Sequence, residues 1–72
     1  MSKQNNPPPW SGAPAWAMWR AQTKRGVWWW EEGEPSPCHD FYKCLDPEKR
    51  RRFAKQGAPN PNWQATLEKR PE

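Results

Sequence analysis

The sequence has little of what usually stabilises a small domain. Only 33% of its 72 residues are hydrophobic, its mean hydropathy is −1.39, and ten residues are proline. No run approaches the roughly 18 apolar residues that a membrane-spanning helix needs. We therefore expect no membrane span, and a core large enough for one domain at most.

Metal ligands and catalytic groups are also scarce. The chain has two cysteines, Cys38 and Cys44, and one histidine, His39. A structural zinc site takes about four protein ligands, so three sulfur and nitrogen donors are too few. Neighbouring residues on a helix point roughly 100° apart, which spoils a Cys38–His39 nucleophile–base pair. We expect no metal, no cofactor and no enzymatic activity, and a cytoplasmic chain whose two thiols are reduced and buried; a short disulfide loop is the alternative.

Tryptophan is abundant instead. Five of the seven tryptophans lie between residues 16 and 30. Each can bury roughly 150–250 Å², and no other stretch offers comparable apolar area. Any fold must therefore be built against this segment.

The Trp-rich segment is compatible with two structures. As a β-hairpin, 16–22 and 27–31 are strands and 23–26 is the turn, where Gly26 supplies a positive φ. As a short helix plus a strand, 14–22 is helical. The β-branched and aromatic residues after Gly26 favour the hairpin.

Strand alternation divides the tryptophans of the second strand. Trp28 and Trp30 point to one face and Trp29 to the other. A chain of this length cannot cover both faces well. We expect one set in the core and the other at a binding surface.

Two proline-containing signals predict helices after the hairpin. A serine–proline pair at 36–37 resembles an N-cap and predicts a short helix through Leu45. An aspartate–proline pair at 46–47 predicts a second helix over 47–56, ended by Gly57. The expected fold is therefore a small α+β domain, in which the Trp-rich hairpin packs on one or two short helices.

The proline content predicts loosely ordered ends. Residues 1–12 form a flexible proline-rich arm, 13–57 the single small domain, and 58–72 a loosely ordered tail. The termini are expected to be disordered.

The charge is modestly basic, with a net charge of +4 and an isoelectric point near 9.4. The basic run at 49–52 is a candidate contact for phosphate or for an acidic surface; its residues are Lys49, Arg50, Arg51 and Arg52. On a helix this run would sweep roughly 300°, so its charge would not lie on one face. We therefore expect nucleic-acid binding to be weak, and the run to be mostly solvated.

Trp and Arg dominate the energetics of protein interfaces. The expected partner-binding residues are Trp10, Trp16, Trp19, Arg20, Lys24, Arg25, Trp28, Trp29 and Trp30.

Part of the chain resembles WW domains. The resemblance covers about 30 residues: Pro14 and Trp16, the basic Gly-containing loop at 23–26, and the paired aromatics Trp28 and Trp29. The family's second tryptophan, followed two residues later by proline, has no counterpart. The resemblance implies a module that binds proline-rich peptides.

In general character the chain resembles the small lytic-bacteriophage proteins that bind host RNA polymerase. The shared features are small size, basic charge, a high tryptophan content and proline-rich ends, without a specific motif. The resemblance implies a monomer that binds polymerase subunits in the host cytoplasm, displaces sigma factor, and inhibits initiation or causes antitermination. This is the function we expect; nucleic-acid binding through 49–52 with Trp stacking and WW-like peptide binding are the alternatives.

Overall fold

The computed structural model describes residues 6–71, which form two antiparallel β-sheets. The strands are β1 (Trp19–Gln22), β2 (Val27–Glu31), β3 (Ser36–Cys38), β4 (Phe41–Lys43), β5 (Arg51–Gln56) and β6 (Glu68–Lys69). Two 3-10 turns, η1 (Trp10–Gly12) and η2 (Trp63–Thr66), are the only helical elements of the described part.

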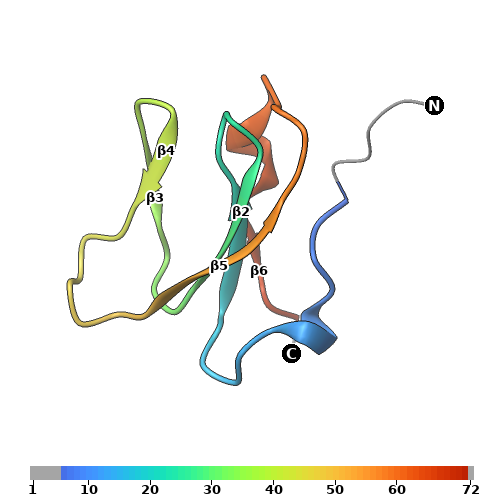
Figure 1. Cartoon of the computed structure of the whole chain (residues 1–72). Coiled ribbons are helices and arrows are strands. Elements are labelled where there is room, and N and C mark those ends of the chain that lie inside the picture. Colours follow the sequence, from blue (N-terminus) through green and yellow to red (C-terminus); the bar gives the residue numbers. More distant parts are fainter. Residues whose placement is uncertain (1–5, 72) are drawn as a thin grey trace.

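The main sheet has the strand order β5-β2-β1-β6, and β3 pairs only with β4. Figure 1 shows the β3–β4 hairpin on one side of β2 and the N-terminal segment on the other. The main sheet is therefore the middle layer, and β2 lies near its centre.

The predicted α+β class is wrong, because both helices expected to cover the hairpin are strands. The segment expected to be helical through Leu45 is the β3–β4 hairpin, and most of 47–56 is β5. Proline in a strand is tolerated where it lies on an edge, as Pro37 does in the two-stranded sheet. The helical alternative for 14–22 is also wrong, since β1 occupies its second half.

The predicted β-hairpin is present, although its first strand begins at Trp19 rather than at residue 16. Gly26 has φ 95°, a conformation that glycine adopts without steric cost. A Cβ at this position would lie 2.5 Å from the carbonyl oxygen of Gly57. Gly26 is therefore required both by the turn and by the close approach of the chain after β5.

The two faces of the main sheet carry different residues. We call the face that bears Arg20, Gln22, Trp28 and Trp30 the arm face, because residues 8–10 lie against it. The opposite face, which bears Ala21, Val27, Trp29, Glu31 and Phe53, is the groove face. This assignment follows from the pairing of alternate residues across β1, β2 and β5.

Trp28 and Trp30 are core residues of the arm face, with 2% and 4% of their surface exposed. The ring of Trp10 packs on Trp30, with centroids 5.4 Å apart. Arg20 lies 4.6 Å from the Trp10 ring centre and donates a hydrogen bond of 2.7 Å to the carbonyl oxygen of Pro8. These contacts hold residues 8–10 on the sheet; residues 1–5 of the predicted arm lie outside the described part.

A smaller cluster packs on the groove face. Ala21, Tyr42 and Trp63 are buried together, with Leu67 against them. The rings of Tyr42 and Trp63 meet edge to face at 5.2 Å, and the Tyr42 hydroxyl donates to the Trp63 carbonyl oxygen at 3.0 Å. This cluster fastens the β3–β4 hairpin and the C-terminal segment to the sheet.

Candidate functional site

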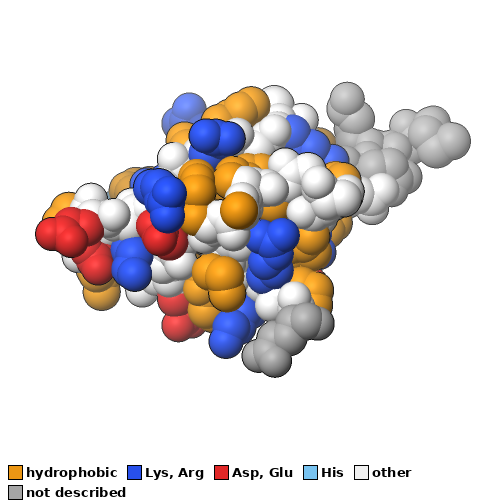
Figure 2. Space-filling view, turned by 90° about the horizontal axis from the view of Figure 1, so that it is seen from below, with side chains coloured by type: hydrophobic (Ala, Val, Ile, Leu, Met, Phe, Trp, Pro, Cys, Tyr) orange, Lys and Arg blue, Asp and Glu red, His pale blue; other side chains and the backbone are white. Residues whose placement is uncertain are grey.

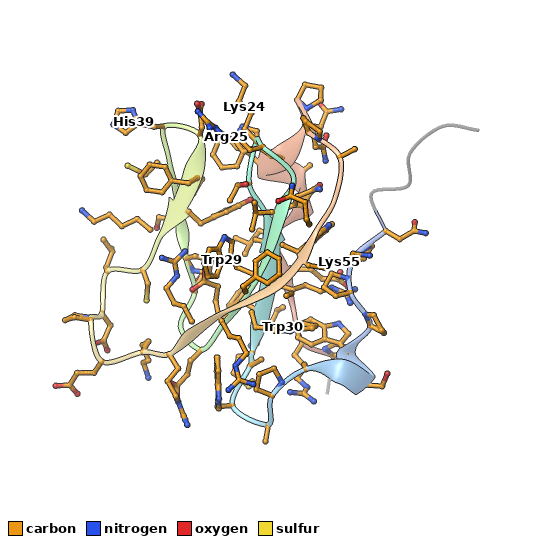
Figure 3. The ribbon with its side chains drawn as sticks, viewed as in Figure 1. Lys24, Arg25, Trp29, Trp30, His39 and Lys55 are labelled. Atoms are coloured by element: carbon orange, nitrogen blue, oxygen red, sulfur yellow. The ribbon has the colours of Figure 1, made fainter. Side chains whose placement is uncertain are left out.

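An open pocket of about 410 Å³ lies on the groove face, between the β1–β2 turn and the β3–β4 hairpin. Its lining is mostly apolar and consists of Thr23, Arg25, Val27, Trp29, His39, Asp40 and Phe41. Figure 3 shows Lys24, Arg25 and His39 at the end of the molecule where the two hairpin turns meet, with Trp29 on the side of β2 that faces β3–β4. We call this pocket, together with the adjoining Phe53, the aromatic groove.

Two exposed aromatic rings belong to this apolar surface: Phe41 lines the pocket, and Phe53 lies next to it. Phe41 is 46% exposed and Phe53 is 53% exposed. The Phe53 ring meets Trp29 edge to face, with centroids 6.3 Å apart. Exposed apolar surface that is contiguous and rimmed by polar groups typically marks an interaction site, and the groove has this character.

The two hairpin turns that form the rim are bonded to each other. The Lys24 amide donates to the Asp40 carbonyl oxygen at 3.0 Å, and the Lys24 ammonium lies 3.8 Å from the Asp40 carboxylate. His39, beside Asp40, has φ 56°, which is sparsely populated by residues other than glycine. The exposed charges contribute little to stability, so the backbone bond is what fixes the spacing of the two turns.

The groove face also carries an ion pair between buried Glu31 and partly exposed Arg51. The Glu31 side chain has no exposed surface, and the Arg51 Nε lies 2.7 Å and 2.9 Å from its two carboxylate oxygens. Arg51 also donates to the Tyr42 carbonyl oxygen and lies 5.2 Å from the Trp29 ring centre. Burial raises the pKa of Glu31, and Arg51 offsets part of that rise. Arg51 thus connects β5, β4 and the floor of the groove.

The tryptophans predicted to bind a partner fall into two groups. Trp28 and Trp30 are buried, whereas Trp10, Trp16, Trp19 and Trp29 are partly exposed. Lys24 and Arg25 are exposed at the groove end, but Arg20 is buried beneath the arm. The structure therefore brings Lys24, Arg25 and Trp29 together at the groove and places Trp10, Arg20 and Trp30 on the opposite face.

The basic run does not lie on a helix, so the expected sweep of its charge around an axis is wrong. Arg50 forms an ion pair with Glu32 at 3.1 Å, and Arg51 pairs with Glu31. Arg50 and Arg52 lie over the Trp16 ring, 5.1 Å and 5.8 Å from its centre. Among the described residues, Arg52 forms no ion pair with a carboxylate.

Figure 2 views the molecule from below, where Lys and Arg side chains lie interspersed with hydrophobic ones. Trp16 is partly exposed, but Arg50 and Arg52 both lie over its ring and would compete with a stacked base. The geometry therefore favours the aromatic groove over the Trp16 region as the candidate site.

Phe41 and Phe53 are site residues that the sequence did not single out, and His39 was weighed only as a metal ligand or as a catalytic partner of Cys38. Phe41 and His39 fall within the helix predicted through Leu45, and Phe53 falls within the helix predicted over 47–56. The available signal was the alternation around Tyr42, which is buried between exposed neighbours. With only three residues in β4, this period is too short to be distinguished from a helical turn.

Other site chemistry is not apparent within residues 6–71. No group of three or more His, Cys, Asp or Glu side chains in this part is placed to hold a metal ion. Cys38 and Cys44 are free and partly exposed. None of the helical elements described has the length and apolarity needed to cross a membrane.

Comparisons with models of known protein families, with curated protein sequences and with solved structures find no match for this chain.

Proposed function

We propose that this chain is a non-enzymatic binding protein that docks one-to-one on a host RNA polymerase and inhibits or redirects transcription. The observation that carries the binding role is the aromatic groove, which exposes Phe41 in a pocket rimmed by Arg25 and Phe53 beside that pocket. Aromatic anchors in a desolvated pocket, surrounded by polar rim groups, are the usual composition of a protein-binding hot spot.

The proposed partner rests on the general resemblance to phage proteins and on charge. Lys24 and Arg25 are exposed at the groove end of this basic chain. Exposed cations accelerate association with an acidic surface and orient the encounter. An acidic polymerase surface that presents an apolar side chain would therefore match the groove in both respects.

The test is titration of fluorescently labelled protein with nuclease-treated bacterial RNA polymerase, as core enzyme and as sigma-bound holoenzyme. Phe41→Ala is expected to weaken binding by about 2 kcal/mol, roughly 30-fold, as the loss of an interface anchor does. The matched control is Leu45→Ala, because Leu45 is 75% exposed but does not line the pocket. Binding to neither enzyme, or equal losses in both variants, would refute the proposal.

Two further titrations separate the alternatives. Single-stranded DNA and RNA are expected to bind weakly and with strong salt dependence. Submicromolar binding of either near physiological salt would assign the chain to nucleic acid instead. Saturable binding of a proline-rich peptide, lost in Trp29→Ala, would support a WW-like module.

A further inference from the structure

The two edges of the main sheet differ in which segments pair with them. At the β1 edge, β6 pairs with Trp19 and Arg20. The amide of Gln22 donates to the Thr66 hydroxyl at 2.8 Å, and the amide of Arg70 donates to the Met18 carbonyl oxygen at 2.7 Å. This edge is therefore closed by the C-terminal segment.

The other edge is β5, the terminal strand on the opposite side. Its outer side pairs with no strand of residues 6–71, and Figure 1 shows β5 crossing β2. An unpaired edge presents a row of N–H and C=O groups that another extended chain can pair with. The strand at the opposite edge, β6, has only two residues, whereas β5 has six. Because a very short edge strand offers few groups for pairing, β5 is the better position for an added strand among the described residues.

The register identifies which backbone groups of β5 face outward. The Glu32 amide donates to the Arg50 carbonyl oxygen at 2.9 Å, so Arg50 faces β2. Backbone groups alternate along an antiparallel strand, so Arg52 also faces β2. Arg51 and Phe53 then direct their N–H and C=O groups away from the sheet. After Phe53 the register shifts by one residue, which ends the regular edge.

The side chains of this edge favour an acidic occupant over a second copy of the chain. Within Arg51–Gln56 there are three basic residues and no acidic one. Pairing two such strands would place like charges opposite each other, which is destabilising. On the arm face Arg52 has no carboxylate partner within residues 6–71, and on the groove face Phe53 is 53% exposed.

We propose that β5 receives an extended acidic segment of the partner as a fifth strand of the main sheet. Its acidic side chains lie on the arm-face side, opposite Arg52, and its apolar side chains lie on the groove-face side, beside Phe53. Main-chain hydrogen bonds supply affinity and alternate side chains supply specificity, as in other strand additions. This proposal deepens the proposed function, on which it rests for the identity of the partner.

The backbone is tested with two variants at one position. Phe53→Ala and Phe53→Pro both lose the ring, but only proline loses the outward N–H, and the pairing with β2 does not use that group. We expect Phe53→Pro to bind RNA polymerase roughly tenfold more weakly than Phe53→Ala, the effect of one hydrogen bond. Thermal unfolding of both variants verifies that each is folded. Equal affinities overturn the strand addition while leaving polymerase binding in place.

A second measurement does not depend on the polymerase or on these variants. The probes are end-blocked hexapeptides of alternating glutamate and valine, or of alternating lysine and valine. Amide exchange by NMR is expected to show that the glutamate peptide protects Arg51 and Phe53 but leaves Arg50 and Arg52 unchanged. Equal effects of both peptides, or no protection, overturn the proposal. Dimerisation of the wild-type chain alone in sedimentation, abolished by Phe53→Pro, would assign the edge to a second copy and overturn it too.

Discussion

The arm face and the groove face are made by the same strands but are covered by different kinds of structure. On the arm face, residues 8–10 lie over Trp30 and are held there by Arg20. On the groove face, Tyr42 and Trp63 cover only part of the sheet, and Phe53 is left half-exposed. One face is therefore closed by the chain itself, and the other ends in an open pocket.

This difference explains why one tryptophan-rich strand carries both buried and partly exposed rings. Trp28 and Trp30 stabilise the fold because their side of β2 is fully covered. Trp29, one position away, lies on the opposite side and lines the groove. Strand alternation alone thus separates structural tryptophans from the candidate binding residue.

The largest expected effect comes from truncating one tryptophan on each face. Trp30→Ala is expected to lose about 3–5 kcal/mol, enough to unfold a marginally stable small domain. Trp29→Ala is expected to lose less stability, because Trp29 is already partly exposed, and to lose polymerase binding while still folded. Thermal unfolding followed by tryptophan circular dichroism, together with polymerase titration, measures both. Equal destabilisation by the two variants would contradict the division between the faces.

A smaller effect is expected from releasing the arm. Arg20→Met keeps the apolar stem but loses the hydrogen bonds to the Pro8 carbonyl oxygen and to Glu68. Hydrogen bonds to charged groups contribute about 1.5–3 kcal/mol, so a loss of about 2 kcal/mol is expected. Hydrogen exchange should increase in residues 6–12 and stay unchanged around Tyr42. The control is Arg52→Met, whose stability is expected to lie within about 0.5 kcal/mol of wild type. If Arg52→Met loses as much stability as Arg20→Met, the loss does not come from releasing the arm.

The smallest effect is a pH dependence that distinguishes two neighbouring glutamates. Arg50 lowers the pKa of Glu32 from 4.5 to about 2 by hydrogen bonding to its carboxylate. Its contribution to stability is therefore present above pH 4.5 and is lost as the pH falls toward 2. Burial raises the pKa of Glu31, so its ionised form opposes folding, and stability falls as pH rises from 4.5 through that higher pKa.

Urea unfolding at a series of pH values measures this difference. Glu32→Gln should remove part of the acid destabilisation between pH 4.5 and 2, whereas Glu31→Gln should remove the opposite trend above pH 4.5. Curves of the same shape for both variants would show that the two carboxylates do not differ as the structure indicates.

The β1–β2 hairpin was predictable because its signals are local. Gly26 supplies the turn, and Val27 with the three tryptophans after it suits a pleated strand. The facing of Trp28, Trp29 and Trp30 follows from alternation once the strand is known. The covering of the arm face was not predictable, because it depends on contacts of Trp10 with residues far along the chain.

The β5 strand was not predicted, because the aspartate–proline pair before it can begin either a helix or an isolated turn. The Asp46 carboxylate accepts a hydrogen bond from the Glu48 amide at 3.0 Å, and the Lys49 amide donates to the Asp46 carbonyl oxygen at 3.1 Å. This is the bonding that would begin a helix, but here it forms an isolated turn. The chain then continues as a strand, because its pairing with β2 outweighs local helix propensity.

The candidate site was only half predictable for the same reason. Lys24, Arg25 and Trp29 belong to the recognised hairpin and were expected at a binding surface. Phe41 and Phe53 lie on strands whose pairing is long-range, so no local pattern placed them beside Trp29. A polar sequence with short strands conceals which aromatic side chains share a face.

The closing of the β1 edge by the C-terminal segment sets an order of events during synthesis. Arg20 and Met18 find their partners in Glu68 and Arg70, about fifty positions further along the chain. While the ribosome is still making these residues, the outer side of β1 is unpaired and the sheet has two open edges. The protein therefore completes its fold only when almost all of the described chain has emerged. Until then another extended chain can pair with β1, as it can with β5 in the complete fold.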